Sequence, residues 1–465
     1  MKISLVSLLA IGLVIAVGCG ESNTDNGNEE QDTSKDGGDD ITPAHPLETI
    51  AIAPSETINT VAIVTWPDDL GEIKPEDIEA AYIEYGLGDD LDKTAPVNVT
   101  ADNMRTVVLG MKAGALTYSI QSTVVVDGET YTSPVHTFET GYAPTGISEC
   151  TEKYRHASLP IDEGYLLLGA MSGSMVTIID TDGDPVWWTE KVEGSVSESA
   201  GTSEMWMDWK GGYIYLMPTN PSWAETHIRR VSIDGMEIED FDVGRGHHSL
   251  KPVPEGGVIF VQQTEDTCDA VMHLDEGGNI TEVLKWTDFM PFTQQCHTNF
   301  VGYEASSDSI YLSSRDYDLA ALVSRDGELQ WAIGRDEYQT AETDDFEMGA
   351  PHDIIALHGL YVWNNGQNLL LFNNIGSDPA VIYEYAFDDA RDKADTVLKY
   401  TREGAHSTQL GNAQRLPSGN TLIVYSVAGI INQIDPEGVV VHRLDFDVPV
   451  GYGYWRPTLY GPPPE

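Results

Sequence analysis

Short apolar runs separated by polar turns fill most of the chain, a pattern that predicts β-strands rather than helices. Between residues 147 and 460, a turn built from Asp and Gly recurs between two strand-like runs, at separations of 41 to 62 residues. The turns are Asp182-Gly183, Asp234-Gly235, Asp275-Glu276-Gly277, Asp326-Gly327, Asp388-Asp389 and Asp435-Pro436-Glu437-Gly438. Asp and Gly tolerate the positive φ that tight hairpins need. Six four-stranded units of this size predict a six-bladed β-propeller over residues 147–460.

Residues 47–141 carry a second set of strand-like runs with turn signals between them, which predicts a small all-β sandwich. The runs are Thr60–Trp66, Ala80–Tyr85, Thr106–Leu109, Thr117–Val126 and Val135–Glu139. Trp66 ends an early run, and Tyr118 follows a Gly-containing turn. This resembles a fibronectin type III domain, which pairs a core tryptophan with a tyrosine corner. Nothing in this stretch suggests chemistry, so we expect a spacer or docking domain.

The first 46 residues are expected to lie outside the folded domains. Met1-Lys2 is a short positive start, and Ile3–Val17 is an apolar run of the length of a signal peptide, too short for an ordinary membrane-spanning helix. The run ends in Ala16-Val17-Gly18-Cys19, which resembles a bacterial lipobox. We therefore expect residues 1–19 to be a lipoprotein signal peptide with Cys19 lipidated, and residues 20–46 to be a disordered acidic tether.

This start predicts an extracytoplasmic protein, lipid-anchored to a bacterial membrane, on the periplasmic side of the outer membrane or at the cell surface. The 465-residue chain has 25 basic and 75 acidic residues, a net charge of −50. Phosphate contacts need Lys and Arg, so this balance excludes a nucleic-acid partner. Most of the carboxylates are expected to be solvated surface groups.

Apart from Cys19, the chain has three cysteines, Cys150, Cys268 and Cys296. An oxidising compartment permits disulfides, and an odd count leaves at least one cysteine unpaired. Cys268 and Cys296 lie in adjacent repeats and are the favoured pair. No two of the three are close enough in sequence for the usual zinc-ligand spacing.

Three histidines precede strand-like runs in the C-terminal half: His248, His297 and His352. His248 lies six residues before the turn that starts at Pro254, and His297 lies six residues before the turn at Tyr303. Equal offsets in successive repeats put side chains at one level of a ring. If these runs are innermost strands of the propeller, the imidazoles converge on its central channel.

The stretch from about 240 to 445 resembles the bacterial arylsulfate sulfotransferases. The strongest match is His297-Thr298-Asn299 followed by Ser313-Ser314-Arg315, and Pro351-His352-Asp353 resembles the motif around that family's nucleophilic histidine. Further matching stretches are His247-His248, Ala380–Asp388 and Gly411–Ile423. The chain departs from the family at Pro351, where glutamine is usual, and in having no counterpart of the family's short disulfide loop.

The resemblance implies a six-bladed propeller behind a small β domain, and sulfuryl transfer from a phenolic sulfate ester to a phenol without a nucleotide donor. His352 would attack sulfur and form a sulfohistidine, and Arg315 would hold the sulfonate oxygens. His248 and His297 would donate hydrogen bonds or the leaving group's proton, and Asn299 would add a neutral donor. Neither a metal nor an organic cofactor is required.

Two other functions remain open at this level. One is a non-catalytic surface lipoprotein whose propeller binds a ligand or a protein, because fold alone does not fix function. The other is a metal-dependent hydrolase with a three-histidine site, against which Arg315 argues, since a cation opposes metal binding nearby. A homo-oligomer is compatible with the sequence, which does not specify the donor or the acceptor.

Overall fold

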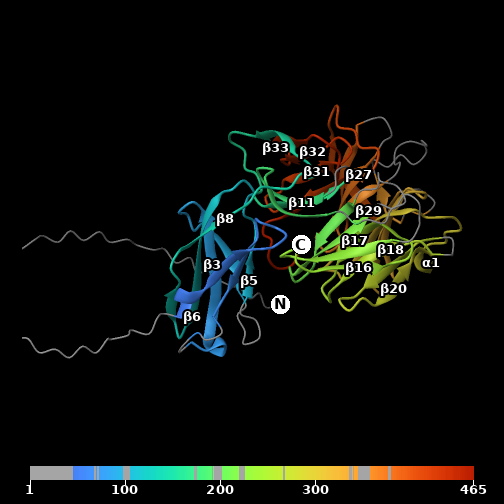
Figure 1. Ribbon diagram of the computed structural model, residues 1–465. Coiled ribbons are helices and arrows are strands. Elements are labelled where there is room, and N and C mark those ends of the chain that lie inside the picture. The colour runs from blue at the N-terminus through green and yellow to red at the C-terminus, as the bar shows by residue number, and fades with distance from the viewer. Residues whose placement is uncertain are drawn as a thin grey trace, which may run out of the picture. The chain divides into compact units, whose positions relative to one another are not determined.

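The structure is a computed structural model, and it describes residues 46–67, 70, 73–97, 105–171, 175–190, 192, 202–218, 226–264, 268–334, 338, 340–343, 357–374 and 379–464. The described chain is almost entirely β-structure, as the ribbon shows (Figure 1). Its short helices are η1 (Pro46–Thr49), η2 (Pro75–Asp77) and α1 (Trp286–Phe289). Over these residues, we find no helix with the length and apolar character to cross a bilayer. The segment 1–19, with Cys19, and residues 20–45 lie outside the described residues.

Residues 51–139 form two antiparallel sheets. The first sheet has the order β1-β2-β5, and the second has the order β4-β3-β6-β7 with β8 also paired to β6. The strands are β1 (Ala51–Pro54), β2 (Ala62–Thr65), β3 (Ile78–Leu87), β4 (Lys93–Pro96), β5 (Arg105–Val108), β6 (Thr117–Val126), β7 (Glu129–Thr132) and β8 (His136–Glu139). Trp66 and Tyr118 are both buried in the core between them, and the Lys112 amide donates a hydrogen bond to Tyr118 Oη at 2.9 Å.

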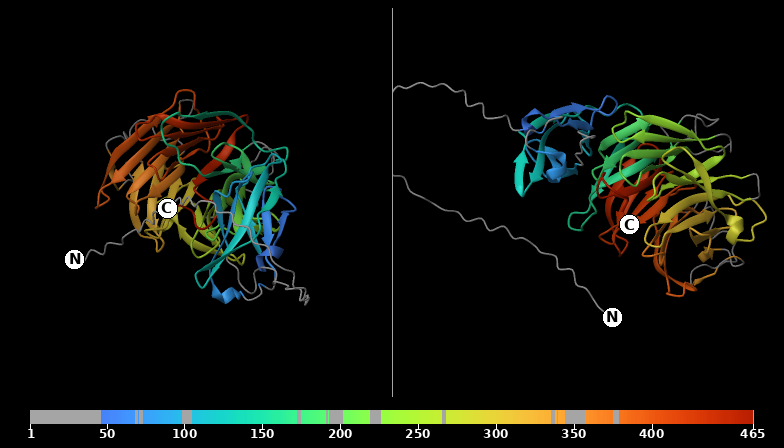
Figure 2. Two further views of the ribbon diagram at one scale, coloured as in Figure 1. Left: turned by 90° about the vertical axis from the view of Figure 1, so that its left-hand side faces the viewer. Right: turned by 90° about the horizontal axis from the view of Figure 1, so that it is seen from below.

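The strands after residue 150 fall into antiparallel sheets built mostly of four consecutive strands (Figure 2). Three of these sheets run β17-β18-β19-β20, β21-β22-β23-β24 and β26-β27-β28-β29, the last with β25 added in parallel. Their bounds are β17 (Gly246–Pro252), β18 (Val258–Gln262), β19 (Ala270–Leu274), β20 (Ile280–Lys285), β21 (Thr298–Glu304), β22 (Ser309–Ser314), β23 (Leu319–Ser324), β24 (Leu329–Gly334), β25 (Glu342–Thr343), β26 (His358–Trp363), β27 (Asn368–Asn373), β28 (Val381–Phe387) and β29 (Lys393–Thr401).

The two remaining sheets join distant parts of the chain. One runs β30-β31-β32-β33-β9, so a strand from residue 150 onward completes a sheet made near the C-terminus. The other runs β12-β11-β10-β13-β14-β15-β16, and β34 pairs with β10. Their bounds are β9 (Cys150–Arg155), β10 (Tyr165–Ala170), β11 (Met175–Asp180), β12 (Pro185–Glu190), β13 (Thr202–Met207), β14 (Tyr213–Pro218), β15 (His227–Ser232), β16 (Ile238–Asp242), β30 (Asn412–Arg415), β31 (Thr421–Tyr425), β32 (Ile430–Ile434), β33 (Val440–Phe446) and β34 (Val450–Arg456).

The Asp-containing turns all occupy the same place in these sheets. Each connects the third and fourth strands of its unit, as between β11 and β12 or between β32 and β33. In the last turn, Asp435 Oδ1 accepts hydrogen bonds from the amides of Glu437 and Val439, while Gly438 has a φ of 82°. The carboxylate therefore fixes the turn, and glycine supplies the conformation that other residues resist.

Six of the described strands contact one another in a closed cycle: β13, β17, β21, β26, β30 and β34. Polar side chains link neighbours in this cycle. Ser249 Oγ on β17 accepts a hydrogen bond from the Val301 amide of β21 at 3.1 Å. Asn412 Nδ2 on β30 donates a hydrogen bond to the Gly453 carbonyl of β34 at 2.7 Å. These bonds fix where each strand starts relative to the next, and so set the level of the residues at the strand ends.

The strands of residues 51–139 contact the sheet of β10 to β12. Ile58, Val61 and Leu109 share one buried cluster with Trp187 of β12. Lys112 Nζ lies within 2.8 to 3.0 Å of three carboxylates of the β11–β12 turn, those of Asp180, Asp182 and Asp184. The contact is therefore both apolar and ionic.

Candidate active site

His297 and Arg315 face one another across the open end of a hairpin. Strands β21 and β22 pair antiparallel with Thr298 opposite Ser314, so the residues that flank this pair are neighbours. The Arg315 amide donates to the His297 carbonyl at 3.1 Å. The separation of 18 residues between them in the sequence is therefore that of one hairpin. The Arg315 side chain is exposed and forms no ion pair with a described carboxylate.

His247 and His248 lie at the start of β17, the strand next to β21 in the cycle. The register of β17 on β18 shifts between Gly246 and Leu250, which marks a bulge. His248 has a φ of 62° and His297 a φ of 48°, both in the left-handed region that non-glycine residues seldom adopt. Such backbone is held in place by its surroundings, and bulges commonly re-aim side chains beside functional sites.

The imidazoles of His248 and His297 form one cluster. Their ring centroids are 5.1 Å apart in an edge-to-face arrangement. Burial lowers the pKa of His248 well below its usual value, and the nearby His247, His297, His358 and Arg315 lower it further. Burial and Arg315 likewise lower the pKa of His297. Both rings are therefore neutral at pH 7, with one N–H and one nitrogen lone pair each.

Asp269 lies behind this cluster, next to His247. Asp269 Oδ1 is 3.5 Å from His247 Nε2, and His247 Nδ1 is 2.8 Å from His248 Nδ1. Burial alone would raise the pKa of Asp269, but His247 and the Thr298 amide, which donates to Oδ2 at 2.7 Å, hold it below its usual value. A carboxylate at His247 Nε2 favours the proton on that nitrogen. His247 Nδ1 then accepts the His248 Nδ1–H, which places the His248 lone pair on Nε2.

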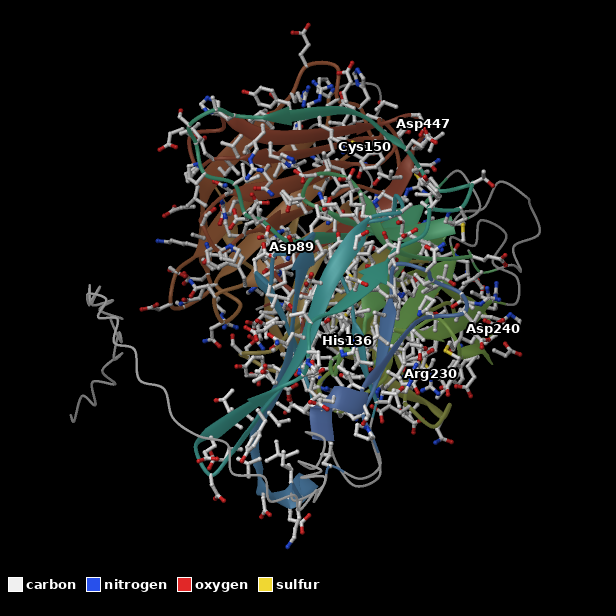
Figure 3. All side chains as sticks on the ribbon, turned by 60° about the vertical axis from the view of Figure 1, so that its left-hand side comes forward. Asp89, His136, Cys150, Arg230, Asp240 and Asp447 are labelled. Carbon is white, nitrogen blue, oxygen red and sulfur yellow. A yellow bond between two sulfur atoms is a disulfide. The ribbon has the colours of Figure 1, made fainter. Side chains whose placement is uncertain are left out.

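A disulfide joins Cys268 to Cys296, with Cα atoms 5.0 Å apart. These cysteines immediately precede Asp269 and His297, so the bond ties the carboxylate and the imidazole of the site together. This is the pair predicted from the sequence, and it closes over a separation of 28 residues rather than a short loop. Cys150, on β9 and labelled in Figure 3, is the free cysteine of the described residues.

Asn299 is fully buried, and its Nδ2 donates to the Leu357 carbonyl at 3.0 Å. Ser313 Oγ donates to the same carbonyl at 3.4 Å, and Ser314 Oγ donates to the Cys296 carbonyl at 2.7 Å. The buried side chains of Asn299, Ser313 and Ser314 thus fix the backbone next to His297 and Arg315. This geometry favours a positioning role for Asn299 over the substrate contact expected from the sequence. His352 lies outside the described residues.

His358, which the sequence analysis did not single out, belongs to the same neighbourhood. It is the first residue of β26, is buried, and contributes to the electrostatic environment of His248. Asn374 Nδ2 donates to the Ser407 and Leu410 carbonyls, so its Oδ1 is the group that accepts from His358 Nδ1 at 3.0 Å. In a neutral His358 ring, this bond would place the lone pair on Nε2. One sequence signal could have indicated it, namely its position just ahead of the apolar run Gly359–Trp363.

The cluster has the composition of a group-transfer site for an anion: neutral nitrogen bases beside an exposed guanidinium. Within the described ranges, the group whose ligand atoms are close enough together for a metal ion is Asp180, Asp182 and Asp184, away from the histidines. Lys112 Nζ already lies among these three carboxylates.

Comparison with solved structures finds matches of low sequence identity, each with a TM-score below 0.5. A protein of unknown function from Bacteroides caccae is 13% identical, with a TM-score of 0.42 over 61% of this chain and 94% of its own. Virginiamycin B lyase from Staphylococcus aureus is 10% identical, with a TM-score of 0.39 over 63% and 87%. TolB from Acinetobacter baumannii is 8% identical, with a TM-score of 0.42 over 75% and 80%. No curated protein matches the chain.

A family model gives a specific assignment. Residues 162–447 match the model described as arylsulfotransferase (ASST), and this range holds more than half of the chain, including His248, His297 and Arg315. The same range contains the disulfide and the Asp269 carboxylate. The chain therefore belongs to the arylsulfotransferase (ASST) family, which makes it a sulfotransferase.

Proposed function

We propose that this protein is an arylsulfate sulfotransferase that moves a sulfuryl group from a phenolic sulfate ester to a phenol through a sulfohistidine, without a nucleotide donor. The observation that carries the proposal is the convergence of His248 from β17 with His297 and Arg315 from the β21–β22 hairpin, within a chain of this family. The substrate's sulfonate is an anion with three oxygens. Arg315 offers it an exposed, forked cation.

The first half-reaction forms a nitrogen–sulfur bond. An imidazole lone pair attacks sulfur, and the bond from sulfur to the phenolic oxygen breaks and releases a phenolate. Arg315 stabilises the charge on the sulfonate oxygens, and an N–H of His297 donates to them. No base is needed in this step, because a neutral imidazole already carries its lone pair.

The second half-reaction returns the sulfuryl group to an acceptor. The phenol oxygen attacks sulfur, its proton moves to His248 Nε2, and the nitrogen–sulfur bond breaks with its electron pair returning to the histidine. The lowered pKa keeps the His248 ring neutral at pH 7, and the tautomer favoured by Asp269 and His247 leaves its lone pair on Nε2, so the ring can accept a proton. His248 then gives the proton to solvent, and the phenolate released earlier takes one up.

The proposed nucleophile is His352, because Pro351-His352-Asp353 resembles the family's motif. His358 is a second candidate, supported by its hydrogen bond with Asn374, which leaves the lone pair on Nε2 of a ring near His248. The two can be told apart by where the covalent adduct forms.

We extend the proposal to the architecture and the location of the protein. The closed cycle of six described strands supports a six-bladed β-propeller, and the buried Trp66 with the Tyr118 hydrogen bond supports a fibronectin type III-like sandwich. The start of the sequence, through Cys19, supports a lipoprotein anchored outside the cytoplasm.

The deciding experiment measures turnover of a chromogenic aryl sulfate by purified protein, with and without an added phenol. We expect transfer to the phenol, parallel lines in two-substrate kinetics, and an acid-labile adduct of one SO3 group when the acceptor is omitted. Intersecting lines with no adduct would indicate direct transfer. Folded protein with no turnover of any aryl sulfate would favour the non-catalytic binding lipoprotein.

A further inference from the structure

A second pocket lies at the opposite ends of the strands that carry the histidines. The histidines mark the starts of β17, β21 and β26, whereas Lys251, Tyr303 and Trp363 lie at or near the ends of the same strands. Tyr303 lies six residues beyond His297, about 20 Å along its strand, and Lys251 lies three residues beyond His248, about 10 Å, since each strand residue advances about 3.3 Å. The pocket is therefore separate from the sulfuryl-transfer site.

The cavity has a volume of about 340 Å³. This is within the range of sites that hold small molecules. Its wall is rich in aromatic side chains, which come from four separate stretches of the chain. The aromatic residues are Trp209, Tyr303, Tyr311, Tyr361 and Trp363. Aromatic walls of this kind bind flat apolar rings by stacking and edge contacts.

Lys251 is the cation that lines this pocket, and its amine has no oxygen partner among the described residues. The residue is only 7% exposed, yet it lines the cavity. Its Nζ lies 3.3 Å from the centroid of the Trp206 ring and 5.7 Å from that of Tyr454. The Nζ atom forms no hydrogen bond or ion pair with any residue that the structure describes. Burying an amine in this way is costly unless a further group satisfies it.

The carboxylate that acts on Lys251 electrostatically, that of Glu204, already accepts hydrogen bonds from other residues. Glu204 on β13 is fully buried and accepts hydrogen bonds from Trp206 Nε1 at 2.9 Å, Tyr454 Oη at 2.5 Å and the Leu250 amide at 2.8 Å. Burial lowers the pKa of Lys251 to about 7, although Glu204 opposes this, and Arg456 lowers it further. Burial likewise raises the pKa of Glu204.

The other charged groups at the pocket are also committed. Glu304 lines the cavity, and its two carboxylate oxygens accept bonds from the Ser306 and Ser307 hydroxyls and the Ser307 amide. Arg456 Nη2 donates to the carbonyls of Gly461 and Pro462, which fixes the segment that brings Pro463 and Pro464 to the wall. Lys251 thus remains the donor available to a bound molecule.

We propose that this pocket binds a small aromatic molecule bearing an anionic group, with the anion on Lys251 and the ring among Tyr303, Tyr361 and Trp363. Trp363 also lines the pocket, and its indole Nε1 is buried with no acceptor among the described residues. The inference does not depend on sulfuryl transfer, because it uses none of the histidines.

An anion at Lys251 raises the pKa of the amine, so binding above pH 7 takes up a proton. Glu304, Glu204 and Arg456 are the other charges facing Lys251. Any proton uptake that they contribute on binding persists when Lys251 is replaced. Removing the amine therefore isolates its share of the proton uptake.

The test measures binding of 2-naphthoate, an aromatic carboxylate with no sulfuryl group, by titration calorimetry in two buffers of different ionisation enthalpy. Wild-type protein is expected to bind and to take up close to one proton at pH 8.5 and almost none at pH 5.5. Lys251→Met keeps the length of the side chain and is expected to weaken binding roughly tenfold or more, with the proton uptake lost. Trp363→Ala is expected to weaken binding while keeping the proton uptake.

Arg315→Lys serves as the matched control, since it alters the other site and should leave 2-naphthoate binding unchanged. Lys251→Met should in turn leave aryl sulfate turnover unchanged, if the proposed function holds. Equal affinity of wild type and Lys251→Met, or no binding by folded wild-type protein at millimolar 2-naphthoate, overturns the proposal. If Lys251→Met does not fold, proton uptake by the wild type and the loss in Trp363→Ala decide the question.

Discussion

His247 Nδ1 and His248 Nδ1 are 2.8 Å apart, so two consecutive residues of one strand are hydrogen-bonded through their side chains. Consecutive side chains of a regular strand point to opposite faces. The φ of 62° at His248 breaks this alternation and turns both rings toward one another. The bulge thereby makes a relay from Asp269 through His247 to His248, which a regular strand could not form.

Replacing Asp269 with Asn should lower the turnover of aryl sulfate about 10- to 100-fold, as loss of a group that orients a functional histidine typically does. Without the carboxylate, the tautomer of His247 is no longer fixed, and His248 Nε2 loses its base character. The rate should be measured across pH, because a shifted limb of the profile indicates a change in the base. Glu282→Gln, an exposed carboxylate on β20, is the control and should retain wild-type turnover.

Arg315→Lys should reduce turnover roughly 100-fold, because a point charge cannot make the paired contacts of a guanidinium with the sulfonate. The side chain is exposed and forms no ion pair with a described carboxylate, so the melting temperature should not change. Steady-state kinetics with thermal unfolding provides both readouts. A variant with normal turnover would remove Arg315 from the site.

His352→Ala and His358→Ala should differ in one respect. The nucleophile's variant forms no SO3 adduct after incubation with aryl sulfate alone, whereas the other variant still forms one. Intact-mass measurement followed by peptide mapping locates the adduct. We expect it on His352, and an adduct on His358 would reassign the nucleophile.

The double variant Cys268→Ser/Cys296→Ser should have a free energy of unfolding about 3 kcal/mol lower than that of the wild type. This is the typical contribution of a disulfide that closes a loop of this size. It should also lose activity, because the bond fixes Asp269 beside His297. Urea denaturation measures the stability. Cys150→Ser, which removes the free cysteine, should leave the unfolding free energy nearly unchanged.

The free energy of unfolding should fall as the pH drops through 6.5. The pKa of His248 and that of His297 lie below their usual value of 6.5 in the folded protein, so the unfolded chain binds more protons in this range. The loss should continue until the pH reaches the folded-state pKa values. Urea denaturation at pH 7.5, 6.5 and 5.5 measures the slope. His248→Asn, which tolerates the positive φ, should reduce that slope, and an unchanged slope would contradict the assignment.

The sequence predicted the parts of the fold that rest on local signals. The Asp-containing turns lie where their carboxylates and glycines were expected to form hairpins, and β6 has the predicted bounds, Thr117–Val126. Strands β1, β4 and β7 were not predicted. Each has four residues, and β1 and β4 end in proline, so neither alternation nor length marks them.

The site was only partly predictable for a related reason. His297 and Arg315 are linked by one hairpin, and their spacing in the sequence carries that information. Asp269, His358 and Lys251 reach their sites through the packing of separate strands, which depends on bulges and on bonds such as that of Ser249 with Val301. A displacement of one residue in any strand would turn these side chains to the other face.

The pairing of β34 with β10 makes residues 450–456 a structural requirement for residues 165–170, almost 300 positions earlier in the sequence. Until residues 450–456 have been synthesised, the edge of β10 that pairs with β34 stays unpaired. Unpaired strand edges favour pairing between molecules. Open arrays of repeats can tolerate the loss of a terminal unit, because each repeat contacts only its neighbours. Here, a nascent or truncated chain that stops at β33 would be prone to aggregation rather than merely shorter, and the closed cycle should form as one cooperative event late in synthesis.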